Sequence, residues 1–206
     1  MHTVLYFGSF NPVHDGHIRI AEYMLEADLC DRVRFIVSPR NPFKEAADLA
    51  DERDRLEMVR LAVQEAPERE RMEVSDVEFN LPRPSWTVNT LEHLRAREPH
   101  ARFSILMGED NLAALHTWKA CEHILKETDI YVYPRREGRA LPFCNPHLTQ
   151  AQQQKIHGLP DAPLLPFAST EIRNGIRCGT EFPEGLNEQV KNYIRERGLY
   201  GYRKRD

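Results

Sequence analysis

What the sequence lacks excludes several classes of protein. No run of about 18 apolar residues occurs, so neither a membrane-spanning helix nor a membrane partner is expected. The first residues show no basic segment followed by an apolar one, so we expect no secretory signal. Only four cysteines are present, and none form a Cys-x-x-Cys pair, which argues against a zinc site or a disulfide framework. These absences predict a cytoplasmic protein with reduced thiols.

The sequence also has no excess of positive charge. Its formal net charge is −4, whereas proteins that bind nucleic acid usually carry a basic face, so nucleic acid is not an expected partner. The local pair Arg135-Arg136 either serves a small phosphorylated ligand or faces solvent. At 206 residues, with 41% hydrophobic and 29% charged residues, the chain is large enough for one sizeable core. We therefore predict a single domain over residues 1–206, with a helical C-terminal portion from about residue 170.

Short apolar runs alternate with amphipathic patterns along the chain. The runs that predict strands are residues 3–7, 32–39, 72–79, 102–108, 129–133 and 164–168. Residues 135–163 are rich in Pro, Gly, Gln and Arg, and they predict a surface insertion with a short helix near residues 150–155. The alternation predicts an α/β fold: a doubly wound, Rossmann-like, mostly parallel sheet with helices on both faces.

The stretch from Gly8 to His17 carries the clearest chemical signal. It joins the first predicted strand to a helix, at the sheet edge where open α/β folds bind ligands. His14 and His17 are three residues apart, which places both imidazoles on one side of the first helical turn. Free N–H groups at a helix start favour an anion, and the two imidazoles suit a phosphoryl group that gains charge in a transition state. The alternatives are histidines that only bond the loop backbone, or a metal site with Asp15 as its nearest carboxylate.

This stretch does not match the common phosphate-binding motifs. The sequence has no P-loop pattern and no Gly-x-Gly-x-x-Gly after the first strand. The pattern Gly-Ser-Phe-x-Pro-x-His-x-Gly-His instead resembles the nucleotidyltransferase superfamily. The second signature of that superfamily corresponds to Ser169–Arg173. There, Ser169 or Thr170 is expected to cap a helix and leave N–H groups free for the β- and γ-phosphates, and Arg173 adds a cation.

The middle of the chain resembles one family within that superfamily, the nicotinate-nucleotide adenylyltransferases. Pro84–Leu91 resembles the family motif P-S-Y-T-x-x-T-L. Gly108–Asp110, followed by Trp118, resembles its G-x-D…W pattern. Lys44 and the helix of Arg55–Val59 match its lysine loop and R-L-E-M helix. The resemblance covers nearly the whole chain, apart from a segment in the predicted insertion.

The resemblance implies a role for each matched residue on the ATP side. His14 and His17 would stabilise the charge on the α-phosphoryl group, and Arg173 would neutralise the leaving pyrophosphate. The residues expected to bind ATP are Gly8, Ser9, Phe10, Lys44, Gly108, Asp110, Ser169 and Thr170. A magnesium ion is expected to arrive with ATP, because the sequence shows no carboxylate cluster that would build a metal site.

On the acceptor side, the resemblance implies a pocket for nicotinate mononucleotide. Thr87 and the backbone around Trp86 would hold the nicotinate carboxylate, and Trp118 would stack on the pyridine ring. Structural alternatives remain open: Trp118 as a core anchor, Thr87 as an N-cap and Asp110 as a capping carboxylate.

The function that the resemblance implies belongs to NAD biosynthesis. The protein would transfer AMP from ATP to nicotinate mononucleotide, giving deamido-NAD and pyrophosphate. The alternatives are a related adenylyltransferase that acts on nicotinamide mononucleotide or phosphopantetheine, and a non-catalytic nucleotide sensor. The sequence leaves open the oligomeric state, with a homo-oligomer as one option, and the role of residues 138–163.

Overall fold

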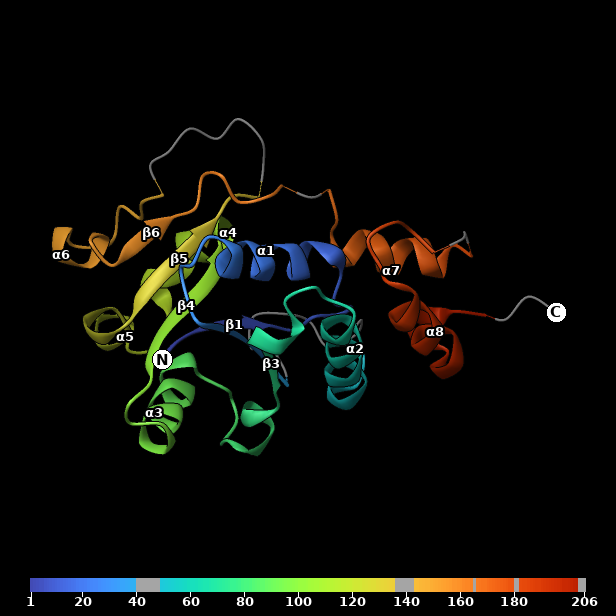
Figure 1. Ribbon diagram of the computed structural model, residues 1–206, viewed down its shortest axis with the longest axis horizontal. Coiled ribbons are helices and arrows are strands. Elements are labelled where there is room, and N and C mark those ends of the chain that lie inside the picture. Colours follow the sequence, from blue (N-terminus) through green and yellow to red (C-terminus); the bar gives the residue numbers. More distant parts are fainter. Residues whose placement is uncertain (40–48, 136–142, 165, 180–181, 204–206) are drawn as a thin grey trace.

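The structure, a computed structural model, describes residues 1–39, 49–135, 143–164, 166–179 and 182–203. Within these residues, six parallel strands form one sheet in the order β3-β2-β1-β4-β5-β6 (Figure 1). The strands are β1 (His2–Gly8), β2 (Arg32–Val37), β3 (Met72–Ser75), β4 (Arg102–Gly108), β5 (Asp129–Tyr133) and β6 (Ile156–Gly158). The chain builds the sheet outward from β1 to β3 and then returns to add β4 on the other side of β1. This order confirms the predicted doubly wound, Rossmann-like sheet.

Helices cover both faces of the sheet (Figure 1). They are α1 (Asp15–Glu26), α2 (Glu52–Gln64), α3 (Thr87–Arg97), α4 (Glu109–Ala114), α5 (Cys121–Glu127), α6 (Gln150–Gln153), α7 (Ser169–Arg177) and α8 (Glu188–Arg197). Along β1, Val4 and Tyr6 pack with α1, α2, α7 and α8, whereas Leu5 packs with α3, α4 and α5. Because successive side chains of a strand point to opposite faces, β1 is buried from both sides.

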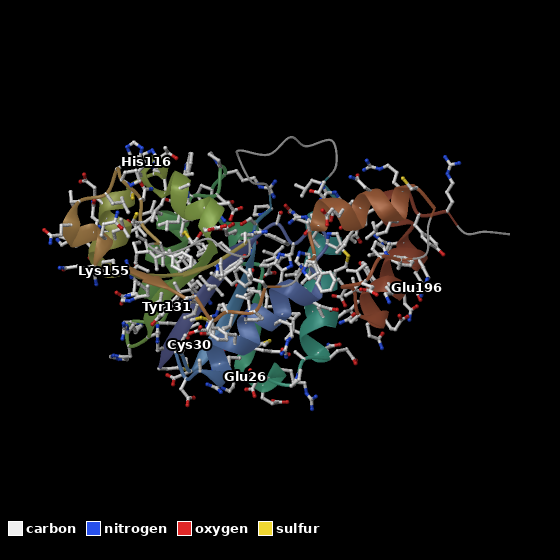
Figure 2. The ribbon with its side chains drawn as sticks, turned by 90° about the horizontal axis from the view of Figure 1, so that it is seen from above. Glu26, Cys30, His116, Tyr131, Lys155 and Glu196 are labelled. Atoms are coloured by element: carbon white, nitrogen blue, oxygen red, sulfur yellow. The ribbon has the colours of Figure 1, made fainter. Side chains whose placement is uncertain are left out.

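The C-terminal helices lie at one end of the molecule. α7 and α8 are grouped beyond the sheet, where α8 contacts α2, while β6 and α6 lie at the opposite end (Figure 1). Figure 2 shows the same separation, with Lys155 and His116 at one end and Glu196 of α8 at the other. The start of α7 lies at the turn after β1, where Ser169 contacts Pro12, and α7 is far from β6.

The predicted strand 72–79 is shorter in the structure. β3 ends at Ser75, whose Oγ accepts a hydrogen bond from the Val77 N–H at 3.3 Å. The chain then turns into the short 3₁₀ helix η3 (Val77–Asn80). A local side-chain hydrogen bond of this kind competes with strand pairing, which explains why the apolar alternation alone overestimates the strand.

The predicted last strand, residues 164–168, is wrong. Its described residues, 164 and 166–168, form no strand. The sixth strand is β6, which lies inside the predicted insertion and pairs with β5; the Ile130 N–H donates to the Lys155 oxygen at 2.8 Å. Main-chain pairing places this three-residue edge strand, so no apolar run marks it in the sequence.

Two helix starts also differ from the sequence-based expectation. The sequence predicts hydroxyl caps at Ser85 or Thr87 and at Ser169 or Thr170. Trp86 instead occupies the cap of α3 and Ala168 the cap of α7, both with extended backbone and neither with a side-chain hydrogen bond. The reason is that Thr87 and Ser169 are the first residues within their helices, one position after the cap, where a side-chain hydroxyl does not face the free N–H groups of the first turn.

The remaining expectations concern cysteines and membrane helices. The structure describes all four cysteines as free; Cys30 and Cys121 are buried, and Cys144 and Cys178 are exposed. In the part of the chain that the structure describes, no helix is long and apolar enough to cross a membrane.

The central strand provides a test of this packing. Leu5→Ala removes a fully buried side chain from β1, and we expect the free energy of unfolding to fall by about 2–5 kcal/mol, because a cavity remains. Leu164→Ala is the matched control, since Leu164 is 37% exposed, and it should change stability by about 0.5 kcal/mol at most. Urea denaturation of the three proteins measures both values. Equal stabilities for the two variants would contradict the placement of β1 at the centre of the core.

Candidate active site

A cavity of about 340 Å³ lies at the carboxyl ends of β1 and β4, where the strand order reverses. The turn after β1 and the starts of α3, α4 and α7 form its walls. The predicted site residues that line it are Gly8, Ser9, Phe10, His14, His17, Trp86, Thr87, Gly108, Asp110, Trp118, Ser169 and Thr170. Arg173 is not part of the cavity wall, and Lys44 lies outside the described residues.

The turn after β1 is built on a tightly packed aromatic ring. Phe10 has a φ of +44° and is 2% exposed, and its ring meets Tyr6 and Phe35 at 5.6 Å between centroids. A Cβ at Gly8 would lie 2.8 Å from this ring, so only glycine fits there. The Phe10 side chain is therefore a core anchor, and its main chain is the part that a ligand would meet.

His14 and His17 form a close pair at the start of α1. Their ring centroids are 3.8 Å apart and their planes are tilted by 34°. The main-chain N–H of His14 donates to Nδ1 of His17 at 3.2 Å. Since Nδ1 accepts this bond, the proton of a neutral His17 is on Nε2. The Nε2–H of His17 therefore lies on the ring edge away from this backbone contact.

His14 is held in its neutral form. Burial, and to a smaller extent the nearby Arg135 cation, lower its pKa to about 4. The side chain is 7% exposed, and in the described part of the chain its buried Nδ1 has no hydrogen-bond partner. A buried nitrogen without a partner is costly, and His14 is also one of the residues that line the cavity.

The C-terminal signature is tied to the turn after β1. Ser169 Oγ donates to the Pro12 oxygen at 3.0 Å. Arg173 donates from Nη1 to the Asn11 oxygen at 2.8 Å and from Nη2 to Thr170 Oγ1 at 3.4 Å. The structure thus brings the two predicted signatures together through hydrogen bonds to main-chain oxygens. The same hydrogen bonds hold the Arg173 guanidinium behind the cavity wall.

The aromatic side of the cavity lies at the start of α3 and after η4 (Leu115–Thr117). Trp86 and Trp118 are half-buried and line the cavity together with Thr87. Lys119, which sequence analysis did not single out, has its ammonium 5.6 Å from the centroid of the Trp86 ring. An aromatic face, a cation and a helix start therefore meet in one pocket, which suits a flat ring that carries an acidic group.

Arg135 is the main site residue that the sequence analysis did not assign. It follows β5 directly and lines the cavity, with Nε 3.4 Å from Asp110 Oδ1 and Cζ 5.6 Å from the centroid of the Tyr133 ring. Beneath it, the hydroxyls of Tyr6 and Tyr133 share a 2.9 Å hydrogen bond, and burial raises the pKa of both phenols. The available signal was the position of an arginine just after a predicted strand. Arg136 lies outside the described residues.

Helices α3, α4 and α7 begin at the cavity without a side-chain cap. Trp86 and Ala168 give α3 and α7 no side-chain cap, and in the described residues the N–H groups of Thr87 and Thr170 donate no hydrogen bond. In contrast, α2, α6 and α8 begin away from the cavity and are capped by the side chains of Asp51, Thr149 and Asn187. Open helix starts, imidazoles and Arg135 make the cavity a set of donors for anions.

This set of donors does not favour a metal ion bound by protein side chains. Among the described residues, no group of three or more His, Cys, Asp or Glu side chains could hold a metal ion. A cation such as Mg²⁺ prefers oxygen ligands, and here it would take most of them from a phosphorylated ligand.

With this geometry described, the chain was compared with known proteins. Residues 5–175 match the family described as cytidylyltransferase-like. The chain belongs to this family. It is 42% identical over 196 residues to a probable nicotinate-nucleotide adenylyltransferase of Flavobacterium johnsoniae, covering 95% of this chain and 97% of the relative. A relative of the same description from Bacteroides fragilis is 38% identical over 192 residues, covering 93% of this chain and 90% of its own length. The resemblance predicted from the motifs is confirmed.

Solved structures share the fold of this cytidylyltransferase-like chain. Plasmodium falciparum nicotinic acid mononucleotide adenylyltransferase complexed with NaAD has a TM-score of 0.76 and 14% identity, and the match covers 98% of both chains. The same protein complexed with APC has a TM-score of 0.75 and 13% identity. At such low identity, the likeness concerns the fold alone.

The lowered pKa of His14 predicts a loss of stability in acid. The unfolded state takes up a proton near pH 6.5, but the folded state does so only near pH 4. The contribution of neutral His14 to the free energy of unfolding is therefore fully present above pH 6.5. It is lost as the pH falls toward 4, which lowers the free energy of unfolding by about 3 kcal/mol. His14→Gln cannot take up this proton, so its free energy of unfolding should fall less between pH 7 and pH 4 than that of the unmutated protein. Urea denaturation at both pH values measures the difference, and equal losses would show that His14 titrates normally.

Proposed function

We propose that the protein transfers AMP from ATP to nicotinate mononucleotide, giving deamido-NAD and pyrophosphate. The observation that carries this proposal is the meeting of the His14–His17 pair, the open start of α7 and the aromatic pocket at α3 around one cavity. The named relatives support the same activity. A cytoplasmic location is part of the proposal, because the four cysteines are free thiols.

In the reaction, the 5′-phosphate of the acceptor attacks the α-phosphorus of ATP in line. The new bond joins that phosphate oxygen to the α-phosphorus, and the bond to the β-phosphate oxygen breaks, so pyrophosphate leaves with the electron pair. The phosphate nucleophile is already ionised at pH 7, so no general base is needed. Catalysis then consists of positioning and charge stabilisation. Mg²⁺ brought with ATP would offset charge on the leaving pyrophosphate.

The donor half of the cavity would hold ATP. His17 Nε2–H and His14 would contact the α-phosphoryl oxygens, and the main chain of Gly8–Phe10 would approach the phosphates closely. The N–H groups at the start of α7, with Ser169 and Thr170, would receive the β- and γ-phosphates. Arg173 would keep this half of the cavity in place through its hydrogen bond to the Asn11 carbonyl oxygen. If that bond were released, its guanidinium would reach the leaving pyrophosphate.

The acceptor half would hold nicotinate mononucleotide. The Thr87 N–H and hydroxyl would bind the carboxylate at the start of α3, and Trp118 would stack on the pyridine ring. Arg135 would offer a cation to a phosphate between the two halves. Asp110, which faces Arg135, would be placed for a ribose hydroxyl. Lys44 keeps its proposed role at the triphosphate.

The choice of acceptor tests the proposal directly. Incubation with ATP, Mg²⁺ and nicotinate mononucleotide should release pyrophosphate, with a kcat/KM at least about tenfold above that for nicotinamide mononucleotide. A carboxylate receives charge-assisted hydrogen bonds at α3 that a carboxamide does not, and about 1.4 kcal/mol gives this factor. Phosphopantetheine should give no product. Equal or better use of the amide would overturn the acceptor assignment, and ATP binding without turnover of any acceptor would indicate a nucleotide sensor.

The role of His17 predicts a loss of turnover. His17→Ala removes the Nε2–H donor at the α-phosphoryl group, and turnover should fall about a hundredfold or more. His123→Ala is the control: it removes a half-exposed imidazole of α5 that does not line the cavity, and turnover should stay within about twofold. Circular dichroism checks that both variants fold. Near-normal turnover in folded His17→Ala protein would contradict the assigned role.

A further inference from the structure

Arg55 is a fully buried arginine of α2 that lies behind the cavity. Its side chain donates four hydrogen bonds, all to main-chain oxygens. Nε donates to Ala50 at 3.0 Å, Nη1 to Ser9 at 2.6 Å and to Ser38 at 2.8 Å, and Nη2 to Pro39 at 2.7 Å. In the described residues no ion pair of Arg55 with a carboxylate is present. The charge is instead met by four carbonyl dipoles.

These four oxygens come from three separate pieces of backbone. Ser9 follows β1, Ser38 and Pro39 follow β2, and Ala50 precedes α2. One planar guanidinium therefore joins the carboxyl ends of two neighbouring strands to the start of its own helix. A lysine could not replace it, since a single ammonium has three donors on one atom and lacks the fixed fork of the guanidinium.

The bond to Ser9 sets the direction of the next N–H group. The peptide between Ser9 and Phe10 is trans, so its C=O and N–H point in opposite directions. Because Arg55 holds the Ser9 oxygen on the core side, the Phe10 N–H is turned the other way, toward the side on which Ser9 and Phe10 line the cavity. In the described residues this N–H donates no hydrogen bond, so it is available to a ligand.

A second contact holds the same turn to the same backbone. Asn11 Oδ1 accepts from the Ala50 N–H at 3.1 Å and from the Tyr200 hydroxyl at 3.0 Å. Ala50 is thus bonded through its oxygen to Arg55 and through its N–H to Asn11. The turn after β1 is fixed on both sides of Phe10 while Phe10 itself keeps a free main-chain donor.

We propose that Arg55 is a positioning residue for ATP: it orients the Ser9–Phe10 peptide so that its N–H binds a phosphate oxygen. The inference rests on the proposed function, because ATP is the ligand of this half of the cavity. Arg55 touches no reacting atom and acts only through the backbone that it holds. Its effect should therefore fall on ATP and spare the acceptor, whose pocket is at α3.

The chain offers a matched control in Arg71. Its guanidinium also donates to three main-chain oxygens, of Asp31 at 3.1 Å, Leu25 at 3.3 Å and Cys30 at 3.0 Å. These oxygens lie at the end of α1 and before β2, at the opposite edge of the sheet from the cavity. Cys30 lies close to the end of α1, where its Sγ is 3.9 Å from the Met24 oxygen, and Figure 2 labels it in the same part of the molecule as Glu26, the last residue of α1. Loss of the Arg71 bonds therefore tests general destabilisation without touching the ATP side.

The test compares Arg55→Lys, Arg71→Lys and the unmutated protein at equal folded fraction. We expect Arg55→Lys to raise the KM for ATP about tenfold or more and to leave the KM for nicotinate mononucleotide within about twofold. The Kd for ATP, measured by calorimetry without acceptor, should rise by a similar factor. Arg71→Lys should change none of these constants by more than about twofold. An unchanged KM and Kd for ATP in Arg55→Lys, or an equal loss in Arg71→Lys, would overturn the proposal.

The Kd for ATP, measured without acceptor, distinguishes a failure of the role of Arg55 from a failure of the proposed function. If the unmutated protein binds ATP but adenylylates no acceptor, the function fails, and the Kd comparison still decides the role of Arg55. If the unmutated protein does not bind ATP, both are overturned. Should Arg55→Lys not fold, nuclear magnetic resonance of ¹⁵N-arginine in the unmutated protein replaces it. ATP should then shift the Arg55 Nε signal and leave that of Arg71 in place, and an unshifted Arg55 signal would overturn the proposal.

Discussion

The parallel pairing of β1 with β2 on one side and β4 on the other is the constraint on which the site depends. Parallel pairing places the carboxyl ends of the strands at the same edge of the sheet, so that the turn after β1 and the turn after β4 face each other. Because the chain runs from β1 toward β2 and from β4 toward β5, in opposite directions along the sheet, no crossover helix in the described part of the chain covers the point between β1 and β4. The cavity is a consequence of that order, and the side chains only determine what it binds.

The attraction for anions is local and comes largely from oriented backbone. The whole chain carries a net charge of −4, so long-range steering of phosphates by its overall charge is not expected. Arg55, Arg173 and Ser169 each donate one hydrogen bond to a carbonyl oxygen of the turn after β1, those of Ser9, Asn11 and Pro12 respectively. Holding carbonyls away from the cavity leaves N–H groups toward it. Arg55 and Arg173, which lie behind the cavity wall, thus help to orient main-chain N–H groups toward the cavity.

The sequence predicts much of this arrangement because the central strands are apolar runs with clear ends: the structure has β4 and β5 with the predicted bounds. It does not predict β6, whose three residues are placed only by main-chain pairing with β5. The two signature motifs are local patterns and could be found by spacing. For Arg135 the sequence left a phosphorylated ligand and solvent as alternatives, because its place in the site depends on β5 ending beside β4. The contact of Arg173 with Asn11 joins residues 162 positions apart, and no pattern identifies it.

The uncapped starts of α3 and α7 have a consequence for the lifetime of the protein. A missing side-chain cap costs a helix about 1 kcal/mol, and a bound anion can replace it. The nucleotide substrates would then serve as parts of the folded structure, completing two helices that the chain leaves unfinished. Without ligand, the segments at Trp86 and Ala168 would open at lower cost, which would expose them to proteases. The cellular abundance of the protein would in this way follow the supply of the molecules that it consumes.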